Sequence, residues 1–228
     1  MCTRLRMPAT CSQRFLSIAC EPSRVQVRFM DEFEHGFGWT PAEREVVERT
    51  SHAVRSGGKV WITDALDGDG VEERIRALGE PAAVVQLLDR HNRDCAPIAK
   101  RLGVPLHVTP FDGVAAAPFE VIPVVRRRRW QEIALWFPAE QILVVADALG
   151  TAEYYRAGDE PVGVHPLLRL KPPRRAFAGL EPLHLLCGHG QSSHGEDVAP
   201  AIRHALATAR RGLPQAWLGG LREAIRRR

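Results

Sequence analysis

The clearest pattern of hydrophobic and polar residues lies near the middle of the chain. A short apolar run over residues 83–88 is typical of a buried strand, and a dense polar segment over residues 89–95 follows it. Helical spacing over residues 96–102 ends at Gly103, and residues 105–108 resume as a strand. The pattern therefore places a polar turn at the carboxyl end of a buried strand, where open α/β sheets usually bind ligands.

Similar patterns predict elements on both sides of this segment. Gly57-Gly58 precedes an apolar run that we expect to form a strand ending at Asp64. The DGDG sequence at 67–70 is typical of a turn that caps a helix over residues 71–78. Further strands are expected over residues 119–125, 133–137, 142–146 and 183–187, and helices over residues 197–211 and 214–228.

The polar turn combines several kinds of chemistry. Within it, a soft donor, a hard donor and two fixed positive charges come from Arg90, His91, Asn92, Arg93, Asp94 and Cys95. Carboxylate, imidazole and thiolate groups are all metal ligands. The alternative interpretation is a solvated turn in which Arg90 and Asp94 form an ion pair.

This order of elements and polar residues resembles the metallo-β-lactamase fold family, whose metal-binding turn follows a buried strand with the motif HxHxDH. The resemblance extends from about residue 59 to residue 189. Asp94 takes the place of the aspartate of the motif. Arg90 and Asn92 then stand where its first two histidines are, and Cys95 stands where its third histidine is. Only the aspartate of the motif is retained.

Two later segments resemble further landmarks of the family. ILVVADALG is similar to the strand that ends in a metal-bridging aspartate, which would be Asp147. LHLLCGHG is similar to the closing strand and its GH turn, which would make His189 a ligand. The PGHT turn of the family should fall between Ile122 and Trp136, where this chain has consecutive arginines and no histidine.

Residues 40–56 allow two interpretations. Thr40 and Pro41 before AEREVVERTSHAVRS form a good helix opening, with threonine as the cap and proline in the first turn. These local features predict a helix. In the family, however, this region usually forms the opening strands, so the resemblance implies strands instead.

The replaced residues affect the two metal positions of the family differently. One position takes its histidines from the places now held by Arg90, Asn92 and an arginine of Arg126–Arg129, and guanidinium groups cannot bind a cation. The other position keeps donors that suit zinc or iron. The resemblance implies that its ligands are Asp94, Cys95, Asp147 and His189. It places His91 at a spacer position, and the alternative is that His91 is a displaced ligand. We therefore expect one zinc, iron or manganese ion, or none if the site is fully degenerate.

The run of four arginines also allows two interpretations. Arg126–Arg129 is typical of a solvated basic patch. Alternatively, one or two of these side chains turn inward and bind a carboxylate or phosphate in place of the lost metal charge. On the second interpretation, the predicted substrate-binding residues are Arg90, Asn92, Arg127 and Arg128.

Composition narrows the function classes only modestly. A length of 228 residues suits one larger globular domain, which we expect over residues 30–228. No apolar run approaches a membrane span, and the formal charge of +4 is too small to indicate nucleic-acid binding. Residues 1–29 lack the apolar core of a signal peptide, so we expect a disordered extension or a mis-assigned start, with Met30 as the true start, and a cytoplasmic location.

The sequence therefore predicts an α/β protein with the four-layer αββα sandwich of the metallo-β-lactamase type. The implied function is a single-metal hydrolase acting on an anionic ester, thioester, lactone or phosphoester. The alternative is a metal-free relative that binds an anionic small molecule through arginines and catalyses nothing. Nucleic-acid processing is disfavoured because the relatives that perform it carry an extra domain. The sequence does not specify the oligomeric state.

Overall fold

The computed structural model describes residues 25–43, 45 and 48–216, which include a six-stranded and a five-stranded sheet. The larger sheet has the order β1-β2-β3-β4-β5-β6. Its strands are β1 (Val27–Phe33), β2 (Gly36–Pro41), β3 (Ser51–Ser56), β4 (Lys59–Thr63), β5 (Pro81–Gln86) and β6 (Leu106–Val108). Strands β4, β5 and β6 are parallel, whereas β1 to β4 pair antiparallel.

The smaller sheet has the order β13-β12-β9-β8-β7. Its strands are β7 (Glu120–Arg127), β8 (Trp130–Phe137), β9 (Ile142–Val145), β12 (His184–Cys187) and β13 (Ser193–His194). Strands β9 and β12 are parallel neighbours. A separate pair is formed by β10 (Leu149–Gly150) and β11 (Gly163–Val164).

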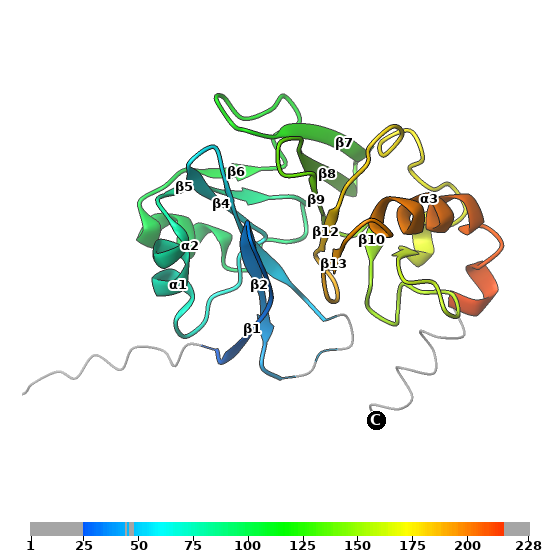
Figure 1. The fold of residues 1–228 in the computed structure, drawn as a ribbon, viewed down its shortest axis with the longest axis horizontal. Helices are drawn as coiled ribbons and strands as arrows, with labels where there is room; N and C mark the ends of the chain where they lie inside the picture. Colours follow the sequence, from blue (N-terminus) through cyan, green and yellow to red (C-terminus); the bar gives the residue numbers. More distant parts are fainter. Residues whose placement is uncertain (1–24, 44, 46–47, 217–228) are drawn as a thin grey trace, which may run out of the picture.

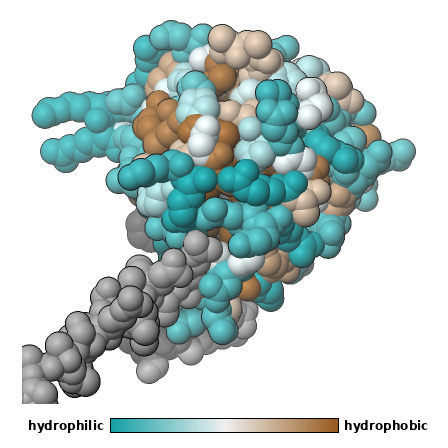
Figure 2. Space-filling model, turned by 90° about the vertical axis from the view of Figure 1, so that its left-hand side faces the viewer, coloured by the Kyte–Doolittle hydropathy of each residue, from teal (hydrophilic) through white to brown (hydrophobic). Residues whose placement is uncertain are grey.

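Helices cover the outer faces of both sheets. Helices α1 (Val71–Leu78) and α2 (Cys95–Leu102) lie against the larger sheet, and α3 (Val198–Thr208) lies on the side of the smaller sheet (Figure 1). The outer face on the α1 and α2 side is mainly hydrophilic, with smaller hydrophobic patches (Figure 2). The layers are therefore helix, sheet, sheet and helix, which confirms the predicted αββα sandwich.

The side chains of β5 point alternately to the two faces of the sheet, and this alternation shows how the sequence produces the layers. Ala83 and Val85 belong to the core between the sheets, whereas Val84 packs in the core beneath α1 and α2. Both faces of the strand are buried, which explains why it appears as a continuous apolar run. Burial of one valine side chain stabilises the fold by about 1.5–3 kcal/mol.

Two sets of backbone hydrogen bonds join the sheets near their strand ends. On one side, the Ile133 N–H of β8 donates to the Leu87 carbonyl, just after β5, at 2.9 Å. On the other side, the Thr50 N–H donates to the Gly188 carbonyl, just after β12, at 2.9 Å. These bonds place the end of β5 against β8 and the start of β3 against the end of β12, which come from distant parts of the chain.

Most predicted elements are present, but the helix predicted within residues 40–56 is wrong. Residues 51–56 form β3, which pairs with β2 on one side and β4 on the other. Tertiary pairing and burial on both faces outweigh the local helix-opening signal. The strands that the resemblance implied are observed instead.

The chain ends are only partly described. The extension predicted over residues 1–29 lies mostly outside the described residues, although β1 already begins at Val27. The helix predicted over residues 214–228 also lies almost entirely outside them. Within the described residues, no helix is both long enough and apolar enough to cross a membrane.

Candidate metal centre

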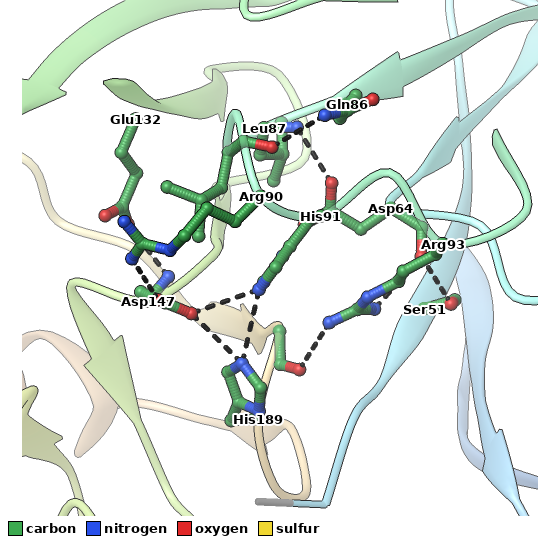
Figure 3. Close-up of polar contacts among 12 residues, drawn as sticks. Ser51, Asp64, Gln86, Leu87, Arg90, His91, Arg93, Glu132, Asp147 and His189 are labelled. Atoms are coloured by element: carbon green, nitrogen blue, oxygen red, sulfur yellow. Dashed lines mark hydrogen bonds and ion pairs between the residues drawn. The ribbon is translucent and has the colours of Figure 1, made fainter. Parts of the chain in front are cut away.

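Three buried side chains meet where the two sheets join. His91 Nε2 and His189 Nε2 lie 3.1 and 3.0 Å from Asp147 Oδ1. The two imidazole nitrogens are 3.4 Å apart (Figure 3). Among the described residues, these three form the group whose donor atoms could together hold a metal ion. His91 comes from the turn after β5, and the other two come from the ends of strands in the smaller sheet.

Strand geometry places Asp147 and His189. Strands β9 and β12 are parallel and pair Val145 with Cys187, and each ligand lies two residues beyond the paired residue of its strand. Gly190, in the GHG turn, has a φ of 95°, and a Cβ there would lie 2.3 Å from the Ala152 nitrogen. Only glycine allows this close turn directly after His189.

Asp64, just after β4 in the larger sheet, holds His91 in place. His91 Nδ1 lies 2.7 Å from Asp64 Oδ2, and the other oxygen of Asp64 accepts from the Leu87 N–H at 2.8 Å. A proton on Nδ1, donated to Asp64, leaves the lone pair of Nε2 directed at Asp147 and His189. This carboxylate–imidazole arrangement is the usual support of a metal-binding histidine.

Arg93 fixes the turn that carries His91. Its guanidinium donates to the carbonyls of Thr50 at 2.5 Å, Asp64 at 3.0 Å and Gly188 at 3.1 Å, and so connects both sheets. Asp64 and Arg93 also have positive φ values, 45° and 41°. Positive φ costs a residue with a side chain about 1–2 kcal/mol, and such conformations concentrate at functional sites.

Glu132 supports Asp147 from the centre of the smaller sheet. The backbone N–H groups of Asp147 and Ala148 donate to Glu132 Oε1 at 2.9 and 2.6 Å, and the Trp130 indole donates to Oε2 at 2.8 Å. Glu132 is completely buried. Burial and the nearby Asp147 carboxylate raise the pKa of Glu132 to about 7.

Arg90 covers the outer side of Asp147. Its guanidinium lies 3.1 Å from Asp147 Oδ2 (Figure 3). It also donates to the Arg129 carbonyl at 3.1 Å and stacks over the Trp130 ring at 4.6 Å. The side chain of Arg90 remains 46% exposed, so part of the guanidinium faces solvent. These contacts use only two of its five N–H donors, and the others are available to a ligand.

The protonation states suit a cation. Although burial opposes ionisation, the neighbouring His189 and His91 rings hold the pKa of Asp147 well below its usual range. Burial lowers the pKa of His189. Burial and Arg93 oppose protonation of His91, but Asp64 and Asp147 outweigh them and raise the pKa of His91. The carboxylate is therefore ionised at neutral pH, and metal binding competes with protonation of His91.

An aromatic wall stands beside the centre. The His165 ring lies 5.0 Å from the Trp130 ring and 5.5 Å from the Tyr155 ring, which in turn stacks on His189 at 5.6 Å. His165 Nδ1 accepts from the Leu167 N–H at 3.2 Å. Burial lowers the pKa of His165 to about 4, so this imidazole is neutral at pH 7.

The structure does not bring Asp94 and Cys95 into the group of three. Asp94 Oδ2 accepts from the Asp67 N–H at 2.9 Å, near the start of α2. Cys95 is buried in the core beneath the helices, with its sulfur 3.9 Å from the Ala65 carbonyl. Burial raises the pKa of the Cys95 thiol to about 12, which disfavours the thiolate that a metal needs.

The predicted substrate-binding residues are also separated in space. Arg90 touches Asp147, whereas Asn92 is exposed and its Oδ1 accepts from Gln86 Nε2 at 3.2 Å. Arg127 and Arg128 are exposed on the hairpin between β7 and β8. Of these four residues, Arg90 is the one that the structure places against a member of the group of three.

Several residues of the centre were not selected from the sequence. The motif alignment places His91 at a spacer position, and the sequence marks Asp64 only as the end of a strand. Glu132 was not identified, although an acid inside the otherwise apolar segment of β8 is a usable signal, because buried acids are rare unless they have partners. Arg93 was read only as a fixed positive charge.

The three donors fit a tetrahedral ion. Metal–ligand bonds of about 2.0–2.1 Å separate tetrahedral ligand atoms by about 3.3–3.4 Å, close to the observed 3.0, 3.1 and 3.4 Å. Asp147 Oδ1 is buried and has no hydrogen bond of good geometry, although two imidazole nitrogens face it. Two imidazoles and one carboxylate are also the ligand set of several catalytic zinc sites. The residues present therefore fit a metal ion.

Solved structures that are similar to this chain in fold include metallo-β-lactamases. The DIM-1 enzyme matches with a TM-score of 0.57 and 14% identity, over 86% of this chain and 99% of its own. TMB-1 matches with a TM-score of 0.55 and 12% identity, over 82% and 98%. The metallo-β-lactamase from Pontibacter korlensis matches with a TM-score of 0.52 and 11% identity, over 80% and 99%.

This protein therefore has the metallo-β-lactamase fold, as the sequence motifs implied. No protein-family model matches the chain, and no curated protein is similar to it in sequence. At 11–14% identity, the structural similarity establishes the fold and not the activity.

Proposed function

We propose that the protein is a single-metal hydrolase that acts on a small anionic ester, thioester, lactone or phosphoester. The main support is the convergence of His91, Asp147 and His189 within 3.4 Å of one another. Three protein ligands are typical of catalytic zinc sites, whereas structural sites usually have four. The side chains are nearly but not fully buried, and 8–10% of their surface remains exposed to solvent.

The residues of the centre would have separate roles in binding the metal ion. His91 and His189 hold the cation through Nε2, and Asp147 holds it through Oδ1 and neutralises part of its charge. Asp64 keeps the proton of His91 on Nδ1, so that Nε2 remains available. A bound zinc, iron or manganese ion would supply Lewis acidity, which makes hydrolysis possible at neutral pH.

Arg90 is the residue best placed to bind the anionic group of a substrate. Its stacking on Trp130 and its bond to the Arg129 carbonyl fix the guanidinium plane before a ligand arrives. A fixed guanidinium loses little freedom on binding and can pair with a carboxylate or phosphate through two hydrogen bonds. It would also stabilise negative charge that develops on the substrate oxygen.

Metal binding and hydrolysis in a matched pair of variants would test the proposal. His91→Ala removes a ligand, whereas Asn92→Ala changes the next residue of the same turn and leaves the three donors intact. We expect His91→Ala to weaken zinc binding by at least about 100-fold and to abolish hydrolysis of a panel of thioesters, lactones and phosphoesters. Asn92→Ala should retain zinc. Equal zinc affinity in both variants would contradict the proposed ligand set.

A metal-free anion-binding protein is the second candidate. It is supported by Arg90, which already pairs with Asp147 and supplies positive charge where the family binds cations. On this reading, the purified protein takes up no metal, and anionic small molecules raise its melting temperature in an Arg90-dependent manner. Uptake of one metal ion per chain would exclude it.

A further inference from the structure

A second polar cavity lies beside β7, apart from the metal centre. Strand β7 is at the edge of the smaller sheet, and the segment that follows η1 (Pro166–Leu168) passes beside it (Figure 1). The cavity between them has a volume of about 650 Å³. We call it the β7 groove. Its basic lining residues are Arg126, Arg127, Lys171, Arg174 and Arg175.

All the charged side chains that line the β7 groove are positive. No aspartate or glutamate of the described chain lines the groove. Arg126, Arg127, Lys171 and Arg175 are all exposed, and none pairs with a carboxylate in the described part of the molecule. Positive charges gathered around one cavity repel each other, so their grouping is unfavourable unless an anion occupies the space between them.

Hydrogen bonds to α3 fix the segment after η1 that forms one wall of the groove. Arg174 donates through Nε to the Leu206 carbonyl at 3.0 Å and through a terminal nitrogen to the Ala207 carbonyl at 3.2 Å, in the last turn of α3. Pro172 and Pro173 restrict the backbone beside it. Arg174 therefore holds the segment in place, and the Arg126 guanidinium lies over the Phe111 ring at 4.9 Å. Arg127, Lys171 and Arg175 are then the cations best placed to meet a ligand.

We infer that the β7 groove binds a small, multiply phosphorylated anion. Guanidinium groups pair with phosphate oxygens through two parallel hydrogen bonds, and lysine adds a mobile point charge. A volume of about 650 Å³ lies within the range of small-molecule sites. The lining residues include no aromatic side chain on which the bases of a single-stranded nucleic acid would stack. These features favour a compact phosphate ligand over a nucleic-acid strand.

This inference does not depend on the proposed hydrolase function. The groove shares no lining residue with the group of His91, Asp147 and His189 or with Arg90. A variant that loses the metal should therefore keep its affinity for phosphate. For that reason binding is best measured in His189→Ala, where pyrophosphate has no metal to chelate, as well as in the unmodified chain.

Calorimetric titration of the full chain with inorganic pyrophosphate would test the inference. Arg127→Ala and Arg175→Ala should each raise the Kd by about ten-fold or more, because each removes charge-assisted hydrogen bonds. Arg128→Ala is the matched control, since it removes an equally exposed arginine of the same hairpin that does not line the groove. We expect its Kd to stay within two-fold of the unmodified chain, and His189→Ala should also bind normally.

Several results would overturn the inference. One is the absence of pyrophosphate binding, and another is a Kd that Arg127→Ala, Arg175→Ala and Arg128→Ala change equally. Citrate, which has a similar charge, should bind at least ten-fold more weakly than pyrophosphate, and equal binding would refute a phosphate site. A further result of this kind is oligonucleotide binding that becomes tighter as the length increases and is lost in Arg127→Ala and Arg175→Ala. That result would identify the ligand of the groove as a nucleic acid and not a small phosphate.

Discussion

The two sheets contribute to the candidate metal centre in different ways. The smaller sheet presents Asp147 and His189 just beyond two neighbouring parallel strands, so regular backbone geometry determines where they lie. The larger sheet presents His91 from an irregular turn, and its position depends on Asp64 and Arg93. A residue just beyond a strand end is thus placed mainly by the backbone, even though Glu132 and Arg90 contact Asp147, whereas a residue on a turn depends on its side-chain partners. The half from the larger sheet should therefore be more sensitive to mutation.

The largest expected effect is on stability, from Arg93→Ala. This change removes three charge-assisted hydrogen bonds where both sheets meet. The Gly188 carbonyl still accepts from the Thr50 N–H and the Asp64 carbonyl from Ser51 Oγ, whereas Arg93 is the donor to the Thr50 carbonyl. Hydrogen bonds to a charged group contribute about 1.5–3 kcal/mol each, so the loss of three should lower the free energy of unfolding by about 3–5 kcal/mol in urea titrations. Arg90→Ala is the control from the same turn.

Arg90 is half exposed and should contribute about 1 kcal/mol or less to stability. A loss of less than 1 kcal/mol in Arg93→Ala, or equal losses in the two variants, would show that Arg93 does not hold the turn.

The next effect is on metal affinity, from Asp64→Asn. The amide keeps the shape of the side chain but can no longer attract the Nδ1 proton of His91 as a carboxylate does. Loss of such a support typically lowers metal affinity by about 10–100-fold. Competition with a zinc-binding dye would measure the change, and unchanged affinity would mean that the turn positions His91 without Asp64.

A pH-dependent effect of intermediate size should come from His165, in the wall beside the smaller sheet. Burial lowers its pKa to about 4 in the folded chain, so the unfolded chain binds the proton first as the pH falls. The stability contribution is complete above about pH 6.5 and is lost between about pH 6.5 and 4.

Between pH 7 and 5 the unmodified protein should lose on the order of 1–2 kcal/mol more than His165→Asn, which retains an acceptor for the Leu167 N–H. Urea titrations at both pH values would measure the difference. Parallel pH profiles of the two proteins would show that His165 is not buried as a neutral group.

The smallest effect on metal affinity is expected from Glu132→Gln. Glu132 supports Asp147 through backbone N–H groups, but the pairing of β9 with its neighbours also fixes that backbone. We therefore expect zinc affinity to fall by less than ten-fold, a smaller loss than in Asp64→Asn. The reverse order of the two losses would contradict the proposed difference between the halves.

The difference between strand ends and the turn also explains which residues of the site could be predicted from the sequence. Asp147 and His189 stand at the ends of apolar runs, and the runs themselves give their positions. His91 lies in a turn where Arg93 has a φ of 41°, so side-chain directions there cannot be counted from a linear motif. The alignment on Asp94 therefore marked neighbours of His91 and not His91 itself.

Two further features depended on distant contacts. The local opening at Thr40 and Pro41 favoured a helix, but pairing of β3 with β2 and β4 produced a strand. Cys95 has suitable metal chemistry in isolation, and only the fold shows that its sulfur lies in an apolar core. Residue type and spacing indicate which groups are available, whereas burial and direction depend on the whole chain.

Anomalous X-ray diffraction from crystals soaked in zinc would test the central claim most directly. The account predicts one strong peak per chain, within about 2.0–2.2 Å of His91 Nε2, Asp147 Oδ1 and His189 Nε2. A peak coordinated by Asp94 and Cys95, or no peak between the two histidines at saturating zinc, would contradict it.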